Sequence, residues 1–270
     1  MKQFWVVGHP IDHSLSPLIH QCFARQFGLT IGYEKRLLEP HAFASEMRAF
    51  FASGGAGANV TVPFKGDAFE FAHEAVGDAV WAQAVNTLVP LPDGRLQGHN
   101  TDGIGLVGDL HRLGFGIEGR RVLLLGAGGA VRGVLPALTR EKPAQLAVAN
   151  RTVRKAEALA GPLNGVDVMA MGLGDDAALS TGWDLVINAT SAGLGGEALP
   201  ISAEAIAGSQ CYDMIYGAGA AFYRSARELG LPAADGLGML VGQAAEAFAL
   251  WHGLQPELEP VIEQLGDTVG

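Results

Sequence analysis

Short apolar runs alternate with amphipathic segments along the first hundred residues. Continuous or alternating apolar runs predict strands, whereas apolar residues at helical spacing predict helices. Strands are expected over residues 4–7, 33–38, 58–62 and 85–91. Asp93-Gly94 predicts a turn after which residues 95–97 return as a hairpin strand. One helix is expected from Ser16 at the N-cap and Pro17 at N1 to Phe27, and another over residues 41–52.

A second series of the same kind begins at Gly119. Strands are expected over residues 121–125, 145–149, 166–171, 184–189 and 210–213. Helices are expected over residues 130–139, 153–160, 238–251 and 256–265. This alternation predicts an α/β protein with parallel sheets built from right-handed βαβ units. The glycine-spaced segment 101–105, which enters a helix, is the expected break between two domains.

Composition narrows the class of protein. Of the 270 residues, 49% are apolar and 17% charged, and the formal net charge of −10 argues against a nucleic-acid or anionic-membrane partner. The two cysteines, Cys22 and Cys211, are far apart, so we expect reduced, buried thiols. No apolar run reaches the ~20 residues of a membrane span, and the histidines lack metal-ligand spacing such as HExxH. We therefore expect a cytoplasmic protein without a metal site.

A glycine-rich turn lies between a predicted strand and a predicted helix. Its residues are Gly126, Ala127, Gly128, Gly129 and Ala130. This context is typical of a dinucleotide-binding turn, in which the chain turns tightly and the helix N-terminus faces a pyrophosphate. Position 131 carries Val where the motif usually has a third glycine, so a purely structural turn is the alternative.

The end of the following strand indicates which dinucleotide binds. An NAD-binding fold usually places an acidic residue there, to bind the ribose 2′-hydroxyl. This chain instead has Asn150, Arg151, Thr152, Val153 and Arg154. Cations at a helix N-terminus oppose the helix dipole, and arginines bind phosphate well. The segment therefore favours NADP over NAD.

Polar residues gather at strand ends and helix starts in the first half of the chain. They are Ser14 and Ser16, Asn59 and Thr61, Lys65, the pair Asn86-Thr87, and the run Asn100-Thr101-Asp102-Gly103. Each alone is typical of a turn or a helix cap. Together they offer hydroxyls, amides, one amine and one carboxylate, which suits a polyhydroxylated small molecule.

These motifs, in this order, resemble those of the shikimate dehydrogenase family over nearly the whole chain. The matching segments also include Gly8-His9-Pro10-Ile11, Asn188-Ala189-Thr190-Ser191, Tyr212-Asp213-Met214-Ile215-Tyr216 and Asp235-Gly236-Leu237-Gly238-Met239-Leu240. The resemblance implies NADP-dependent interconversion of 3-dehydroshikimate and shikimate, in chorismate and aromatic amino acid biosynthesis. It also implies a substrate domain over residues 1–103, completed by residues 238–270, and a Rossmann-like NADP-binding domain over residues 104–237.

The resemblance further implies roles for individual residues. Lys65 and Asp102 would be the catalytic pair. Substrate would be bound by Ser14, Ser16, Asn59, Thr61, Asn86, Tyr216 and Gln243. Cofactor would be bound by Gly126 to Ala130, by Asn150, Arg151, Thr152 and Arg154, and by Met214 and Gly238. The chain departs from the family pattern at Gln21 and over residues 217–221, where the cofactor contacts are therefore open.

The chemistry expected of the pair follows from charge. A hydride arriving at a ketone leaves negative charge on its oxygen, which a cation or acid must meet. We expect Lys65 to stabilise that charge and donate the proton, and Asp102 to orient Lys65. Two alternatives stay open: an enzyme acting on quinate or an amino-substituted analogue, and a non-catalytic NADP-binding sensor. The expected assembly is a monomer or a homodimer.

Overall fold

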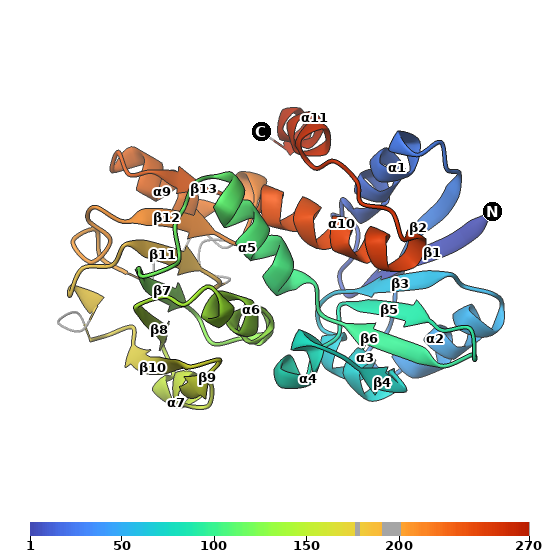
Figure 1. Cartoon of the computed structure of the whole chain (residues 1–270), viewed down its shortest axis with the longest axis horizontal. Coiled ribbons are helices and arrows are strands. Elements are labelled where there is room, and N and C mark those ends of the chain that lie inside the picture. Colours follow the sequence, from blue (N-terminus) through green and yellow to red (C-terminus); the bar gives the residue numbers. More distant parts are fainter. Residues whose placement is uncertain (176–178, 191–200, 270) are drawn as a thin grey trace. The chain divides into compact units, whose positions relative to one another are not determined.

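A computed structural model describes residues 1–175, 179–190 and 201–269 (Figure 1). The chain forms two compact units. The first unit contains Met1–Gly105 and Val241–Glu263, and the second contains Leu106–Leu240 and the residues from Gln264 onward. The breaks between the units are at 105/106, 240/241 and 263/264.

The first unit contains a six-stranded sheet in the order β2-β1-β3-β5-β6-β4. Its strands are β1 (Lys2–Gly8), β2 (Ile31–Leu37), β3 (Gly57–Val60), β4 (Glu74–Ala75), β5 (Thr87–Pro90) and β6 (Leu96–His99). Its helices are α1 (Ser16–Gln26), α2 (Phe43–Ala52), α3 (Lys65–Phe71) and α4 (Asp78–Ala82). Helices α5 (Asp102–Arg112) and α10 (Leu237–His252) each contain one of the breaks between the units.

The sheet of the first unit contains both parallel and antiparallel pairs. Strand β1 pairs in parallel with β2 and β3, but β5 pairs antiparallel with both β3 and β6. The hairpin expected around Asp93-Gly94 is present as β5 and β6. The chain between β3 and β5 contains α3, β4 and α4, and it returns β5 antiparallel to β3.

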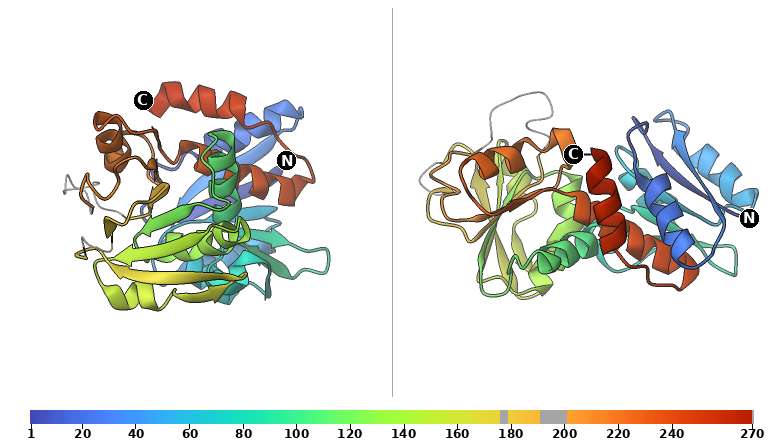
Figure 2. Two further views of the ribbon diagram at one scale, coloured as in Figure 1. Left: turned by 60° about the vertical axis from the view of Figure 1, so that its left-hand side comes forward. Right: turned by 90° about the horizontal axis from the view of Figure 1, so that it is seen from above.

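Apolar side chains cover both faces of this sheet. Along β1, Phe4 and Val6 face one way, in a cluster with Tyr33 of β2 and Trp251 of α10. Val7 faces the other way and belongs to a cluster with residues of α2, α3 and α4. The alternation is the period of two expected of a strand. Helices α1 and α2 accordingly lie on opposite sides of the sheet (Figure 2, right).

The second unit contains a seven-stranded sheet in the order β13-β12-β11-β7-β8-β10-β9. Its strands are β7 (Arg121–Leu125), β8 (Gln145–Asn150), β9 (Gly161–Leu163), β10 (Val166–Gly172), β11 (Leu185–Asn188), β12 (Gln210–Asp213) and β13 (Ala233–Ala234). Its other elements are α6 (Gly129–Arg140), α7 (Val153–Glu157), the 3-10 turn η1 (Gly217–Gly219) and α9 (Ala221–Glu228), and α11 (Glu259–Val269) ends the described chain. All pairs are parallel except β9 with β10. Without β9, the strand order is that of a Rossmann sheet. In such a sheet the order in which strands are added along the chain reverses between β7 and β11, although these two strands are parallel.

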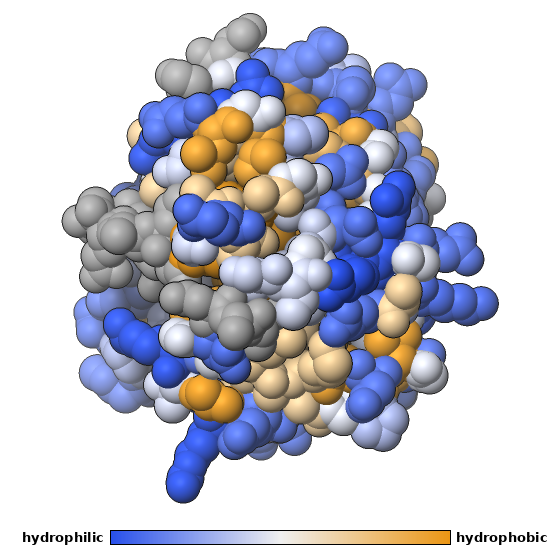
Figure 3. Space-filling model, turned by 90° about the vertical axis from the view of Figure 1, so that its left-hand side faces the viewer, coloured by the Kyte–Doolittle hydropathy of each residue, from blue (hydrophilic) through white to orange (hydrophobic). Residues whose placement is uncertain are grey.

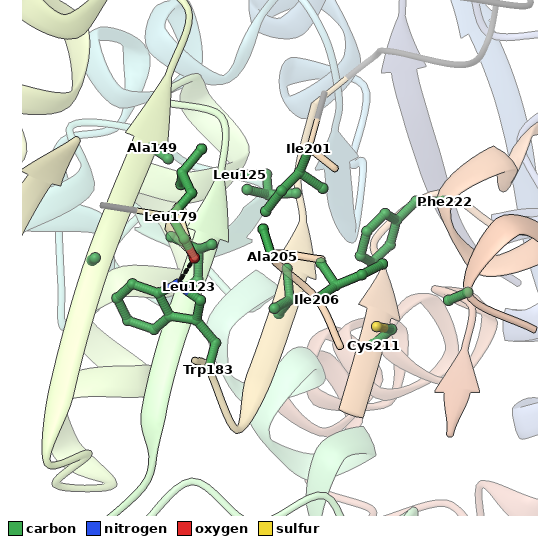
Figure 4. Packing of buried hydrophobic residues seen from close by; sticks show 13 residues of the cluster. Leu123, Leu125, Ala149, Leu179, Trp183, Ile201, Ala205, Ile206, Cys211 and Phe222 are labelled. Atoms are coloured by element: carbon green, nitrogen blue, oxygen red, sulfur yellow. Dashed lines mark hydrogen bonds between the residues drawn. The ribbon is translucent and has the colours of Figure 1, made fainter. Parts of the chain in front are cut away.

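The central strands of the second sheet, β7, β8, β11 and β12, are largely buried on both faces, as in a parallel α/β sheet. On one face, Leu123 and Leu125 pack with Trp183, Cys211 and Phe222 (Figure 4). The indole of Trp183 donates a hydrogen bond of 2.8 Å to the Leu179 carbonyl within this cluster. Cys211 is fully buried, and burial raises its pKa to about 12. Cys22 is also buried, and within the described residues neither thiol forms a disulfide, as expected.

Several element limits differ from the sequence-based expectation. Helix α1 begins at Ser16 itself rather than after it, and the Ser14 hydroxyl accepts a 3.3 Å hydrogen bond from the Ser16 amide. Helix α7 ends at Glu157, three residues early, because the chain turns at Gly161 (φ 120°) into the unexpected strand β9. Helix α6 continues through Pro136.

The surface is mostly polar where it can be seen. On the face drawn in Figure 3, hydrophilic side chains predominate, and the apolar side chains form separate patches. No helix in the described part of the chain is long and apolar enough to cross a membrane.

A buried histidine of α1 contacts β2 in the first unit. His20 is fully buried, and its ring stacks on Tyr33 with centroids 4.5 Å apart. Neither ring nitrogen has a hydrogen-bond partner among the residues described. Burial and then the neighbouring His252 lower the pKa of His20 from 6.5 to about 3, although the nearby Asn59 amide acts in the opposite direction.

This burial predicts a pH dependence of stability. The unfolded chain binds a proton at His20 below about pH 6.5, whereas the folded protein stays neutral there down to about pH 3. The free energy of unfolding should therefore fall by up to about 1.4 kcal/mol per pH unit as the pH drops through this window. Urea unfolding of His20→Leu should show a shallower pH slope than wild type. A difference between the two proteins that is the same at every pH would indicate a packing effect alone.

Candidate active site

Polar residues of the first unit gather where β3 and β6 end and β5 begins. Asn59 lies near the carboxyl end of β3 and pairs with Thr87, the first residue of β5. Thr87 in turn pairs with His99, the last residue of β6. The antiparallel hairpin therefore brings the end of β3, the start of β5 and the end of β6 together. This explains why residues 59, 86 and 100–102 meet in space.

Lys65 and Asp102 form an ion pair at this point of the sheet. The Lys65 Nζ lies 2.6 Å from Asp102 Oδ2, with side-chain exposures of 22% and 10%. Asp102 is the first residue of α5, where the helix dipole favours a carboxylate. Lys65 is the first residue of α3, where the dipole disfavours a cation, so the ion pair offsets a local cost. The backbone also fixes Lys65, since its carbonyl accepts a 2.9 Å bond from the Val85 amide.

Asn86 holds the other oxygen of Asp102. Its side-chain Nδ2 donates to Asp102 Oδ1 at 2.8 Å and to the Thr101 hydroxyl at 3.0 Å. Its Oδ1 accepts from the Thr101 amide at 3.0 Å and from the Thr87 hydroxyl at 2.9 Å. Both amide hydrogens of this buried residue are therefore used within the protein. In this structure Asn86 positions Asp102, and its predicted contact with substrate remains a prediction.

Asn59 is held in the same way. Its Nδ2 donates to the Thr87 hydroxyl at 3.0 Å and to the Asn86 carbonyl at 3.3 Å, and its Oδ1 accepts from the Tyr33 hydroxyl at 2.6 Å. Asn59 thus continues the network from Asn86 toward α1 and β2. Its direct contact with substrate also remains a prediction.

The other predicted substrate residues of this unit lie around the network. The Ser14 hydroxyl donates to the Ser16 hydroxyl at 3.2 Å. Gln243 of α10 accepts from the Thr101 hydroxyl at its backbone carbonyl, 3.0 Å away. Thr61 follows β3, and its backbone amide bonds to the Val7 carbonyl at 2.9 Å.

The arrangement combines one cation with neutral hydrogen-bonding groups. An ammonium group has three donors, and one of those of Lys65 is directed at Asp102. The remaining donors suit an oxygen on which negative charge develops. The paired serine hydroxyls suit a carboxylate, because each hydroxyl can turn to donate.

The predicted glycine turn lies in the second unit at the reversal point of the sheet. Gly126 follows β7 with φ 108°, which favours glycine. A Cβ there would lie 3.1 Å from the carbonyl oxygen of Ala189, which follows β11, the neighbouring strand at the reversal. Helix α6 begins at Gly129, with Gly128 as its N-cap. The amides of its first turn have no intrahelical partners and can bind an anion. This geometry fits a pyrophosphate.

The predicted 2′-phosphate segment follows β8 in the same unit. Asn150 Nδ2 donates to the Thr152 carbonyl at 2.9 Å, which shapes the turn before α7. Arg151 and Arg154 are exposed. Among the described residues neither arginine side chain has a hydrogen-bond or ion-pair partner. Two such guanidinium groups with no carboxylate between them fit a phosphate.

A buried polar cluster lies at the ends of β11 and β12. Asp213 accepts from Asn188 Nδ2 at 2.9 Å and from the amides of Ile215 and Tyr223, each at 3.2 Å. Burial raises the pKa of Asp213, and these donors act against that rise. Asn188 Oδ1 accepts from the Thr190 hydroxyl at 2.7 Å. The cluster thus holds Thr190, directly after β11, and the segment that follows β12.

The remaining predicted residues of the second unit follow β12. The Met214 amide donates to the Asn188 carbonyl at 2.8 Å. Tyr216 is half-buried, and burial raises its pKa. The structure shows no hydrogen bond from its hydroxyl to a described residue. Their contacts with cofactor or substrate remain predictions.

Gly238 has a structural requirement of its own. A Cβ at this position would collide with the carboxylate of Asp109. That carboxylate cannot move away easily, because it accepts from the Tyr212 hydroxyl at 2.7 Å and from Arg112 Nε at 2.8 Å. The resemblance implied a cofactor contact for Gly238, and close packing is a second reason for a glycine there.

The sequence analysis gave no individual role to Tyr33, Thr87, Thr101 or Asp109. The repeated Asn-Thr pairs at residues 86–87 and 100–101 were the signal for the two threonines. No comparable signal marks Tyr33 or Asp109, because their partners are distant in sequence. Among the described residues, no cluster of three or more His, Cys, Asp or Glu has the geometry of a metal site.

Three family models match the chain in order. The shikimate dehydrogenase substrate binding domain matches residues 6–88. Shikimate / quinate 5-dehydrogenase matches residues 110–194, and the shikimate 5′-dehydrogenase C-terminal domain matches residues 236–265.

Individual proteins match over almost the whole length. The shikimate dehydrogenase (NADP(+)) of Cellvibrio japonicus is 52% identical over 264 residues, covering 96% of this chain and 95% of that protein. The structure of an Ael1 enzyme from Pseudomonas putida matches with a TM-score of 0.91 and 40% identity, covering 98% of each chain. The shikimate 5-dehydrogenase of Thermus thermophilus, solved with NADP(H) and shikimate, matches with a TM-score of 0.86 and 34% identity, covering 97% of this chain and 98% of that one. With such identity over nearly its full length, the chain belongs to the shikimate dehydrogenase family.

Proposed function

We propose that this protein catalyses the NADP-dependent, reversible reduction of 3-dehydroshikimate to shikimate, a step toward chorismate and the aromatic amino acids. The Lys65–Asp102 pair, 2.6 Å apart and embedded in neutral hydrogen-bonding groups, carries the proposal. Family membership supports it, and so does the name of the Cellvibrio japonicus relative.

Lys65 performs the acid-base work in this proposal. NADP(H), when bound, supplies or accepts the hydride. In the reductive direction, Lys65 Nζ donates to the oxygen on which charge develops and transfers a proton to it. Asp102 keeps the Lys65 ammonium directed at that oxygen, and Asn86 keeps Asp102 in place.

The substrate is held through its hydroxyls and carboxylate. Ser14 and Ser16 bind the carboxylate, while Thr61, Asn59, Asn86 and Gln243 face the ring hydroxyls, and Tyr216 contributes from the loop after β12. The protein has a net charge of −10, which repels an anionic substrate at long range. Hydroxyl and amide donors suit this role because they bind the substrate through short-range hydrogen bonds.

The cofactor preference follows from the segment after β8. The turn from Gly126 to Ala130 binds the pyrophosphate, and Arg151 and Arg154, with Asn150 and Thr152, bind the 2′-phosphate. Met214 and Gly238 lie along the nicotinamide side. The absence of a carboxylate between Asn150 and Lys155 favours NADP over NAD.

The expected compartment and assembly complete the proposal. A dehydrogenase that uses NADP(H) and a small acid suits the cytoplasm. The protein acts as a monomer or a homodimer.

The decisive experiment follows the 340 nm absorbance of NADPH. Wild-type protein should reduce NADP with shikimate much faster than NAD with shikimate or NADP with quinate. Lys65→Ala should lower kcat by about a thousandfold or more, because both charge stabilisation and the proton donor are lost. The matched control is Lys35→Ala, an exposed lysine of β2.

Each other outcome points to a different protein. Comparable rates with quinate would indicate a broader quinate/shikimate enzyme. NADP binding without turnover in the folded protein would favour the sensor. Full activity of Lys65→Ala would contradict the assigned proton donor.

Arg151→Ala tests the phosphate clamp. The KM for NADP should rise about ten- to a hundredfold, since a hydrogen bond to a charged group contributes about 1.5–3 kcal/mol. The KM for shikimate should change less than about twofold, and added salt should raise the KM for NADP less steeply than in wild type. Arg227→Ala, an exposed arginine of α9, is the control. An unchanged KM for NADP in Arg151→Ala would remove Arg151 from the clamp.

A further inference from the structure

Tyr33 occupies an unusual place for a tyrosine of an edge strand. It lies on β2, and its ring packs between His20, with centroids 4.5 Å apart, and Phe4, with centroids 6.4 Å apart. Only 6% of the residue is exposed. Two nearly parallel ring contacts leave the side chain little freedom, so the position of its hydroxyl is fixed.

The hydroxyl of Tyr33 is bonded to one of the predicted substrate residues. It donates to Asn59 Oδ1 at 2.6 Å. The phenol has a single hydrogen, so this bond uses its only donor.

This bond sets which way the Asn59 amide faces. Since the oxygen of Asn59 faces Tyr33, its nitrogen faces Thr87 and the Asn86 carbonyl. Removing the Tyr33 hydroxyl would leave the Asn59 oxygen without this donor. A buried polar group left without its partner is costly, so the Asn59 side chain would reorient.

We propose that Tyr33 is a positioning residue for substrate binding, whose buried hydroxyl sets the orientation of Asn59. This proposal rests on the function proposed above. The effect of removing the Tyr33 hydroxyl should be greatest at Asn59. Asp102 should be affected less, because the Thr101 amide orients Asn86 independently, at 3.0 Å.

Tyr33→Phe tests the proposal by deleting only the hydroxyl. The KM for shikimate should rise about tenfold, the size expected for one hydrogen bond. The kcat should fall less than about threefold, and the KM for NADP should not change. Tyr212→Phe is the matched control, because it also deletes a buried hydroxyl, bonded to Asp109 at 2.7 Å, in the other unit. Its KM for shikimate should equal that of wild type.

A merely structural role would not raise the KM for shikimate while leaving kcat and the KM for NADP almost unchanged. If Tyr33 only supports the fold, Tyr33→Phe should lower thermal stability and leave the KM for shikimate unchanged, which would overturn the proposal. An equal rise of this KM in Tyr33→Phe and Tyr212→Phe would also overturn it.

A second readout does not depend on turnover. The side-chain NH2 signals of Asn59, assigned with Asn59→Asp, report on its orientation in ¹⁵N NMR spectra. They should shift and lose protection from solvent exchange in Tyr33→Phe but not in Tyr212→Phe. Unchanged Asn59 signals in Tyr33→Phe would overturn the positioning role of Tyr33, whether or not the protein is active. Failure of the wild-type protein to oxidise shikimate would refute the proposed function instead.

Discussion

The ion pair between Lys65 and Asp102 is the interaction on which the proposed chemistry depends. Its two members begin different helices, and the helix dipole favours the carboxylate of Asp102 but disfavours the cation of Lys65. The network around Asn86 constrains the pair, because it holds one carboxylate oxygen while Lys65 holds the other. A carboxylate bound at both oxygens has little freedom to rotate, and the ammonium is then directed consistently.

The constraint originates in the topology of the first sheet. A short antiparallel hairpin follows the three parallel strands, and its first strand pairs with β3. This pairing places the Asn59–Thr87 pair and the segment from Asn100 to Asp102 at the edge where β3 ends. In the second unit, the reversal of strand order between β7 and β11 also brings separate segments of the chain together, because it places the Gly126 turn beside Ala189. Both candidate sites are thus products of strand order as well as of residue identity.

Much of this could be predicted from the sequence. Apolar periodicity located the main strands, and the glycine turn and the run after β8 have local signatures that need no tertiary information. The ordered motifs identified the family, which the comparisons confirm. The antiparallel pairing of β5 with β3 was not predicted, since periodicity does not specify a strand's partner. Tyr33 and Asp109 were missed for a related reason, because their hydrogen-bond partners lie 26 and 103 residues away.

The central claim is that Lys65 and Asp102 act as one unit. A double-mutant cycle tests it most directly, with kcat/KM for shikimate measured in Lys65→Met, Asp102→Asn and the double variant. If the two residues act together, the double variant should be about as impaired as the worse single variant. Losses that multiply in the double variant would show independent roles and contradict the account.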